Sequence, residues 1–217
     1  ASPQERAALI VLANEWVAAA ERCPDEPERT SALISAGYVL EVGGEARWAA
    51  DQYWRAQQHA RAQSEAAGPG EQPLRVLEAD AARQRGRALE RVFEFDDALA
   101  SYHRIIDDPV FSESDQPQLQ DVHLDALWCA LALHYQLRRQ QEVDGLLRHL
   151  RRIVAAPRRT TNVEVARRRH ELLASGVFLR STLTAERGQG RQAIREFERF
   201  LAEFAGTEQP HLARLHP

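Results

Sequence analysis

The sequence has 217 residues and a formal net charge of −4, with 44% hydrophobic and 28% charged residues. This composition argues against disorder throughout, and the length is sufficient to bury a core. Alanine is abundant and aromatic residues make up only 7%, which favours helices because alanine loses no side-chain entropy in a helix. All strongly basic residues are arginine, since lysine is absent, and this is typical of a GC-rich bacterial genome.

The sequence gives no sign of membrane insertion. The apolar stretch nearest the start, residues 7–13, is too short to span a bilayer and lacks the basic region and cleavage pattern of a signal peptide. The chain begins at Ala1 and contains no methionine, which we interpret as a processed protein or a fragment of a longer one. The two cysteines, Cys23 and Cys129, are too differently placed to form a disulfide framework, so both cytoplasm and periplasm remain open as compartments.

Helical periodicity predicts helices along the whole chain and no strand. Ser2, Pro3 and Glu5 form a start signal, because serine can cap a helix, proline suits its first position and glutamate can reach back to the cap. Residues 108–116 are predicted to be a loop. Proline and glycine divide the chain into an N-terminal helix within 1–26, helix hairpins over 27–66, 73–107, 117–155 and 161–205, and the start of a truncated helix within 206–217.

The hairpins share a spacing of small and large residues. In three of them a small residue of the first helix precedes an alanine of the second by twelve positions: Gly37 and Ala49, Gly86 and Ala98, Ser181 and Ala193. An aromatic residue follows each alanine four positions later: Tyr53, Tyr102 and Phe197. The third hairpin matches with a one-residue deletion between Ala132 and Val143. Small residues at these positions let two helices approach closely, so we expect Gly37 and Gly86 at close contacts.

This pattern resembles the tetratricopeptide (TPR) repeat, and the resemblance covers about residues 31–205. From Ala49 to Ala98 is 49 residues, to Val143 another 45 and to Ala193 another 50, whereas a regular TPR has about 34, so the repeats are extended. The resemblance implies an all-α protein that forms one domain over residues 1–217, an α-solenoid of stacked antiparallel helix hairpins. A HEAT-like or generic α-solenoid is the nearby alternative.

The resemblance also implies a binding surface. TPR proteins bind peptides or partner domains along the concave face, which the first helix of each hairpin lines. The residues implied as partner-binding are Ile34, Tyr38, Arg83, Arg87, Arg91, Leu133 and Phe178. The three arginines are spaced by four residues and share one stripe of a helix, which suits an acidic protein or peptide.

A second candidate surface is the arginine-rich segment 138–169, which has ten arginines and three acidic residues, a local charge of +7 against −11 for the remainder. The patch would comprise Arg148, Arg151, Arg152, Arg158, Arg159, Arg167, Arg168 and Arg169. These arginines are interpreted as solvated helix faces, as a surface for an acidic partner, or as a nucleic-acid contact. Nucleic acid is the less favoured of these partners, and a surface that stacks on single-stranded bases is disfavoured because the segment contains no Phe, Trp or Tyr.

No catalytic motif is recognisable, and no catalytic residue, metal or cofactor is expected. Gly68 and Gly70 lack the lysine of a phosphate-binding loop. His123 and His134 share a helix face but would lie about 16 Å apart along the axis, and Cys129 points away from both.

The first hypothesis for function is a non-catalytic scaffold or adaptor, a segment of a larger bacterial assembly. The segment Ala193–Leu201 resembles the hairpins of bacterial envelope TPR proteins, which points to the periplasm. One alternative is a regulatory helical domain that binds nucleic acid or an acidic effector through its arginines. The other is an accessory domain of a multidomain enzyme.

Overall fold

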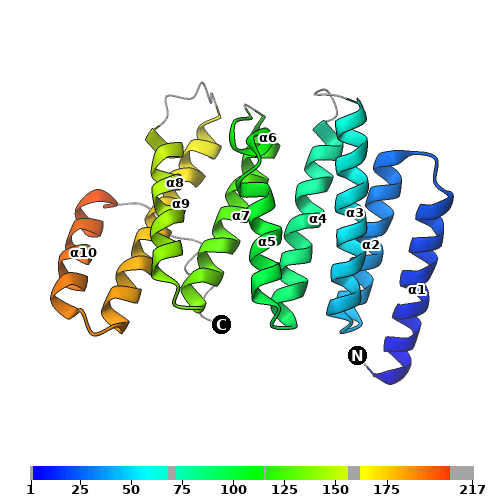
Figure 1. Cartoon of the computed structure of the whole chain (residues 1–217), viewed down its shortest axis with the longest axis horizontal. Coiled ribbons are helices and arrows are strands. Elements are labelled where there is room, and N and C mark those ends of the chain that lie inside the picture. The colour runs from blue at the N-terminus through cyan, green and yellow to red at the C-terminus, as the bar shows by residue number, and fades with distance from the viewer. Residues whose placement is uncertain (1, 68–71, 115, 156–161, 206–217) are drawn as a thin grey trace. The chain divides into compact units, whose positions relative to one another are not determined.

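The computed structural model describes residues 2–67, 72–114, 116–155 and 162–205, and all regular elements among them are helices (Figure 1). The all-helical prediction is confirmed. The helices are α1 (Pro3–Arg22), α2 (Glu26–Val42), α3 (Ala46–Ala67), α4 (Gln72–Arg91), α5 (Phe95–Ile106), α6 (Pro109–Ser112), α7 (Pro117–Gln136), α8 (Gln140–Ala155), α9 (Val163–Glu186) and α10 (Gly190–Glu203).

Two local details test the expected helix ends. The start signal of α1 is confirmed: Ser2 Oγ accepts the Glu5 backbone N–H at 3.3 Å, and Glu5 Oε2 accepts the Ser2 backbone N–H at 2.6 Å. The loop expected over 108–116 is wrong in part, because the short helix α6 lies within it. Asp108 caps α6 by accepting the Val110 N–H at 2.9 Å, and Phe111 is buried. The helix expected within 206–217 lies outside the described residues.

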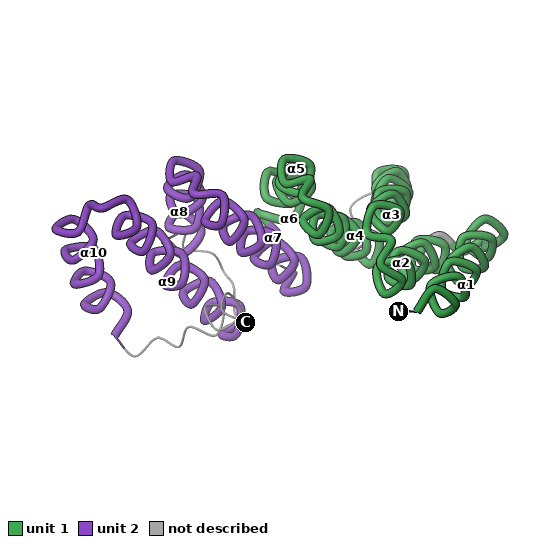
Figure 2. The backbone as a smooth tube through the Cα atoms, turned by 90° about the horizontal axis from the view of Figure 1, so that it is seen from below, with its two compact units in different colours: residues 1–113 green, residues 114–217 purple. Residues whose placement is uncertain are grey.

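The helices form two compact units, residues 1–113 (unit 1) and 114–217 (unit 2) (Figure 2). In unit 1 each helix from α1 to α5 packs against the next, and α2 also contacts α4. In unit 2, α9 contacts α7, α8 and α10, while α7 contacts α8. Each unit therefore holds two of the predicted hairpins with their first helices side by side: hairpin 1 (α2 and α3) and hairpin 2 (α4 and α5), then hairpin 3 (α7 and α8) and hairpin 4 (α9 and α10).

One backbone geometry recurs in the turns of all four hairpins. Each turn contains one residue with positive φ: Gly44 at 85°, Phe93 at 62°, Arg138 at 56° and Gly188 at 77°. The residue after it donates its backbone N–H to the carbonyl five positions earlier, at 2.8 to 3.2 Å, which closes the end of the first helix. Five positions after each positive-φ residue comes a buried small or branched side chain: Ala49, Ala98, Val143 and Ala193. The turns therefore align the hairpins residue by residue.

This alignment corrects hairpin 3, because the predicted one-residue deletion is wrong. Seven positions before the positive-φ residues stand Gly37, Gly86, Leu131 and Ser181, and nine positions after them stand Tyr53, Tyr102, Leu147 and Phe197. The residue of hairpin 3 that corresponds to Gly37 is Leu131, not Ala132. The sequence hides this register because an arginine, not a glycine, has the positive φ in that turn.

Hairpins 1 and 2 each contain a glycine on the first helix that faces a tyrosine on the second. A Cβ added to Gly37 would lie 2.5 Å from Cε1 of Tyr53, and one added to Gly86 would lie 2.4 Å from Cε1 of Tyr102. The prediction of close helix contacts at both glycines is confirmed. Both rings are buried, and each hydroxyl donates to a carboxylate one turn after its glycine, Tyr53 to Glu41 at 2.7 Å and Tyr102 to Glu90 at 2.5 Å.

Hairpin 3 has two medium-sized side chains at the same positions. Leu131 and Leu147 are both buried, and a Cβ added to Gly176 of α9 would meet Leu147 Cδ2 at 2.7 Å and Leu131 Cδ1 at 2.9 Å. The pair of leucines thus replaces the glycine and tyrosine of hairpins 1 and 2. It also contacts α9 at Gly176, which is therefore a point of close approach between hairpins 3 and 4.

Two substitutions at positive-φ residues of the turns should change the stability of the protein in opposite directions. Gly188→Ala should destabilise the protein by about 1–2 kcal/mol, because a side chain at positive φ is strained even though nothing lies within 4 Å of the new Cβ. Arg138→Gly should be stabilising by about 0.5–1 kcal/mol, since relief of strain exceeds the added flexibility of the unfolded chain and the loss of the exposed ion pair with Glu186. Urea unfolding of both variants measures the difference, and equal signs would contradict the assigned turn geometry.

Candidate anion-binding groove

The predicted partner-binding residues of unit 1 lie on α2 and α4, but most of their charge is already neutralised. Arg83 donates to Asp80 at 2.6 Å and Arg91 to Glu41 at 2.7 Å, whereas Arg87 is exposed and pairs with no carboxylate in the described part of the chain. Tyr38 is 63% exposed and so is available to a partner. Ile34 instead packs against buried residues that include Leu33. This face is polar and internally paired rather than strongly cationic.

In unit 2 one of the two predicted partner-binding residues is buried and the other is half-buried. Leu133 is 1% exposed, so its prediction as a binding residue is wrong: it belongs to the core. Phe178 is half-buried, with its ring centroid 5.6 Å from that of Phe197 and 5.8 Å from that of Phe200. These contacts hold α9 and α10 together, because aromatic rings at such distances attract each other beyond their burial.

The described members of the predicted basic patch do not form one exposed, unpaired surface. Arg167 pairs with Glu164 and Glu171 at 2.5 Å each, and Arg168 bridges from α9 to Asp121 and Asp125 of α7 at 2.6 and 2.8 Å. Arg169 is buried at 7% exposure. Arg158 and Arg159 lie outside the described residues. The exposed members that remain together are Arg148, Arg151 and Arg152 of α8.

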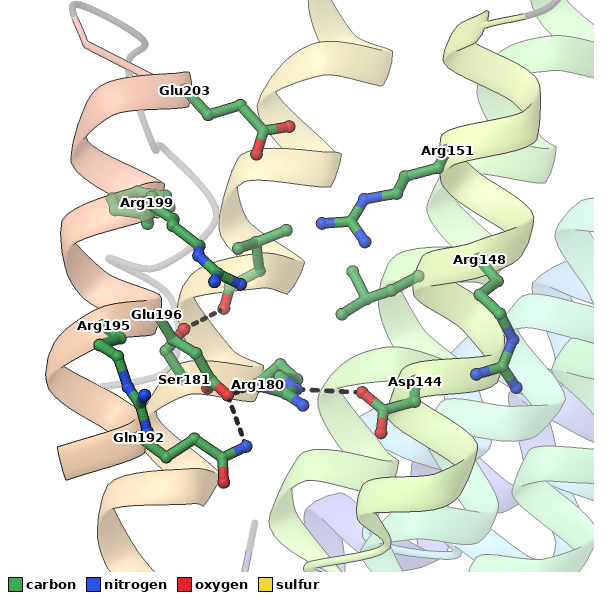
Figure 3. Close-up of a pocket in the computed structure, with 13 residues that line it drawn as sticks. Asp144, Arg148, Arg151, Arg180, Ser181, Gln192, Arg195, Glu196, Arg199 and Glu203 are labelled. Atoms are coloured by element: carbon green, nitrogen blue, oxygen red, sulfur yellow. Dashed lines mark hydrogen bonds and ion pairs between the residues drawn. The ribbon is translucent and has the colours of Figure 1, made fainter. Parts of the chain in front are cut away.

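Two of those three arginines line a groove of about 560 Å³ in unit 2 (Figure 3). One wall is α8, the other is α10, and the floor is α9. The lining residues are Asp144, Leu147, Arg148 and Arg151 from α8, Val177, Arg180 and Ser181 from α9, and Gln192, Arg195, Glu196, Arg199, Phe200 and Glu203 from α10. The groove is thus partly apolar at its base and lined by charge along both walls, and its volume is in the range of ligand sites.

Arg180 joins the two walls of this groove. Its guanidinium donates to Asp144 of α8 at 3.1 Å and pairs with Glu196 of α10. Burial disfavours the charge of Arg180, but its bonds to Glu196 and Asp144 outweigh this and raise its pKa. Burial likewise acts against the Glu196 carboxylate, yet its bonds with Arg180 and Gln192 lower its pKa. Arg180 and Glu196 therefore favour their charged forms, and we call Arg180 the strut of the groove because it contacts both walls.

Four other arginines of the groove have no carboxylate partner among the described residues: Arg148 and Arg151 on one wall, Arg195 and Arg199 on the other. Arg195 only donates to the Arg191 carbonyl of its own helix, at 3.3 Å. Arg180, Asp144 and Glu196 together carry −1 and Glu203 adds −1, so these four arginines bring the net charge of the lining to +2. Two rows of guanidinium groups around a hollow raise the local concentration of anions.

The sequence predicts the arginines on the α8 wall of this groove but not those on α9 and α10. Arg148 and Arg151 belong to the predicted basic patch, whereas Arg180, Arg195 and Arg199 were not singled out. The spacing of four between Arg195 and Arg199 is the same signal that marks Arg83, Arg87 and Arg91, and could have been noted. What no spacing could reveal is that α10 turns this stripe toward α8.

A second hollow, of about 500 Å³, lies in unit 1 between α1, α2 and α3. It is lined by Leu33, Trp54 and His59 among others, and Arg55 pairs with Glu21 at 3.5 Å on its rim. No group of three or more histidine, cysteine, aspartate or glutamate side chains gathers around a point that could hold a metal, as far as the described ranges extend. Within the same ranges, no helix is long and apolar enough to cross a membrane.

Comparison with known proteins assigns no family to the chain, so its function is inferred from its own residues. No protein-family model matches the sequence. No curated protein and no solved structure matches the chain significantly either.

Proposed function

We propose that the chain is a non-catalytic binding module, built of TPR-like helix hairpins, that holds an acidic segment of a partner protein in the groove of unit 2. The observation that supports this most directly is the set of four arginines without carboxylate partners on the two walls. Arginine forks form charge-assisted hydrogen bonds to carboxylates, and the apolar residues at the base of the groove, Leu147, Val177 and Phe200, offer contact to the rest of a side chain or backbone.

The ion pairs weaken the alternative of nucleic-acid binding through the arginine-rich segment. Arg167 and Arg168 are committed to four carboxylates, so a phosphate backbone would have to displace existing partners. Duplex DNA needs several free cationic contacts along its length, because its affinity comes largely from released counterions. The groove instead concentrates its unpaired charge in one hollow. This arrangement supports the scaffold or adaptor role that we propose, in which the module recruits one acidic partner to a larger assembly.

A fluorescence titration of the full chain tests the proposal. The probes are a labelled twelve-residue peptide rich in aspartate and glutamate, the same peptide with asparagine and glutamine in their place, and a random DNA duplex. We expect the acidic peptide to bind at least about tenfold more tightly than the neutral one, with a loss of affinity at higher salt. Equal binding of the two peptides, or tighter binding of the duplex, would contradict the proposal.

A further inference from the structure

Two arginines, one on each wall of the groove, extend into the space between the walls. Figure 3 shows the guanidinium of Arg151 pointing from α8 into the hollow and that of Arg199 pointing into it from α10. Neither has a carboxylate partner among the described residues, and neither is close in sequence to the other. An anion bound between them would receive donors from opposite sides.

The shape of an anion decides how well it can use such donors. A carboxylate has two oxygens in one plane with its carbon, and one planar guanidinium can satisfy both as a fork. A phosphoryl group has three terminal oxygens arranged around phosphorus and a charge of about −1.5 to −2 at neutral pH, so it accepts from two facing guanidinium groups at once. Arginine clusters are for this reason a recurring solution for phosphorylated side chains.

The strut Arg180 makes a dianion acceptable in this hollow. Without it, Asp144 and Glu196 would place two negative charges on the groove lining beside the ligand. With it, one of these two charges is compensated by a side chain that itself stays in the floor, so the five arginines and three carboxylates of the lining leave a net charge of +2. Glu203 is a further acidic residue of the lining, on α10. Figure 3 shows it toward the same end of the groove as Arg151 and Arg199, away from Arg180. Its charge opposes a dianion.

We infer that the groove between α8 and α10 recognises a phosphorylated side chain, held between Arg151 and Arg199, within the acidic segment that the proposed function assigns to it. The inference therefore rests on that function and narrows it. Arg148 and Arg195 bind flanking acidic residues, and phosphorylation of the partner turns a weak contact into a stable one.

Three fluorescein-labelled peptides test this, identical except for serine, phosphoserine or glutamate at the centre of an acidic sequence. The phosphoserine peptide should bind the full chain at least about tenfold more tightly than the glutamate peptide, because only the phosphoryl group engages both walls. Inorganic phosphate should compete with it. Equal affinity for phosphoserine and glutamate would overturn this inference while leaving the proposed function standing. Failure of all three peptides to bind would instead overturn the proposed function.

Variants locate the binding to the groove. Arg151→Gln and Arg199→Gln should each reduce the preference for phosphoserine over glutamate to below about threefold, since one facing donor is lost. Arg152→Gln is the matched control, because Arg152 is exposed on the same helix but does not line the groove. Glu203→Gln should increase affinity for the phosphoserine peptide more than for the serine peptide. A preference that survives both arginine variants, or that falls equally with Arg152→Gln, would rule out this site.

Discussion

Replacing Gly86 with leucine should destabilise the protein by about 1–3 kcal/mol, because the new side chain has no space between α4 and α5. Even its Cβ would lie 2.4 Å from Cε1 and 2.5 Å from Cζ of Tyr102. The tyrosine ring cannot easily move aside, since it is buried and its hydroxyl is bound to Glu90. For a chain of this size the cost corresponds to a fall in melting temperature of roughly 2–12 °C.

The sequence of hairpin 3 supplies the compensating change. It has leucine at both equivalent positions, Leu131 and Leu147, and both are buried. The double variant Gly86→Leu with Tyr102→Leu should therefore be more stable than the sum of the two single changes by about 0.5–3 kcal/mol, the range measured for residues in contact. Thermal and urea unfolding of the four proteins complete this double-mutant cycle.

A helical glycine in open space provides the control. Gly145 lies in α8, and the only atom within 4 Å of an added Cβ is Arg148 Nη2 at 3.9 Å. Gly145→Leu should be neutral or stabilising, because leucine favours the helix by up to about 1 kcal/mol over glycine. If Gly86→Leu melts like the wild type, or if the double variant shows no coupling, the alignment of hairpins 2 and 3 is wrong.

The parts of this fold that follow from the sequence are those determined by local spacing. Caps, prolines and helical periodicity predicted the helices of 12 to 24 residues, and the confirmed Ser2–Glu5 capping box is an example. The close contacts of Gly37 and Gly86 also followed, because a small residue sixteen positions before a tyrosine occurs in both hairpins. These features depend on residues within one hairpin, where sequence distance fixes distance in space.

The features of the fold that could not be predicted depend on residues whose type gives no signal of their conformation or contacts. Glycine marks the turns at Gly44 and Gly188, but Phe93 and Arg138 adopt the same positive φ without any sequence signal. Leu133 was placed on the binding face, yet the rotation of α7 puts it in the core. Arg168 belongs to the predicted basic patch, and its pairing with Asp121 and Asp125 has no local signal because both are more than forty residues away.

Charge reversal of Arg195 and Arg199 together should weaken acidic-peptide binding by about 100-fold or more. Each arginine contributes hydrogen bonds to a charged group, worth about 1.5–3 kcal/mol where they form, and each glutamate that replaces it adds repulsion. Titration of Arg195→Glu/Arg199→Glu against the wild type measures the loss. Far-UV circular dichroism and melting curves should change little, because neither side chain has a carboxylate partner among the described residues whose charge would be left unpaired.

The matched control is Arg152→Glu with Arg191→Glu, which makes the same change in net charge on the same two helices. Both side chains are exposed and neither lines the groove. This variant should lose only a few-fold in affinity, through weaker long-range attraction that moderate salt screens out. If the two double variants bind equally weakly, net charge rather than the groove attracts the peptide. If instead Arg87→Glu alone abolishes binding, the acidic segment binds the α2 and α4 face of unit 1, and the groove of unit 2 has another role.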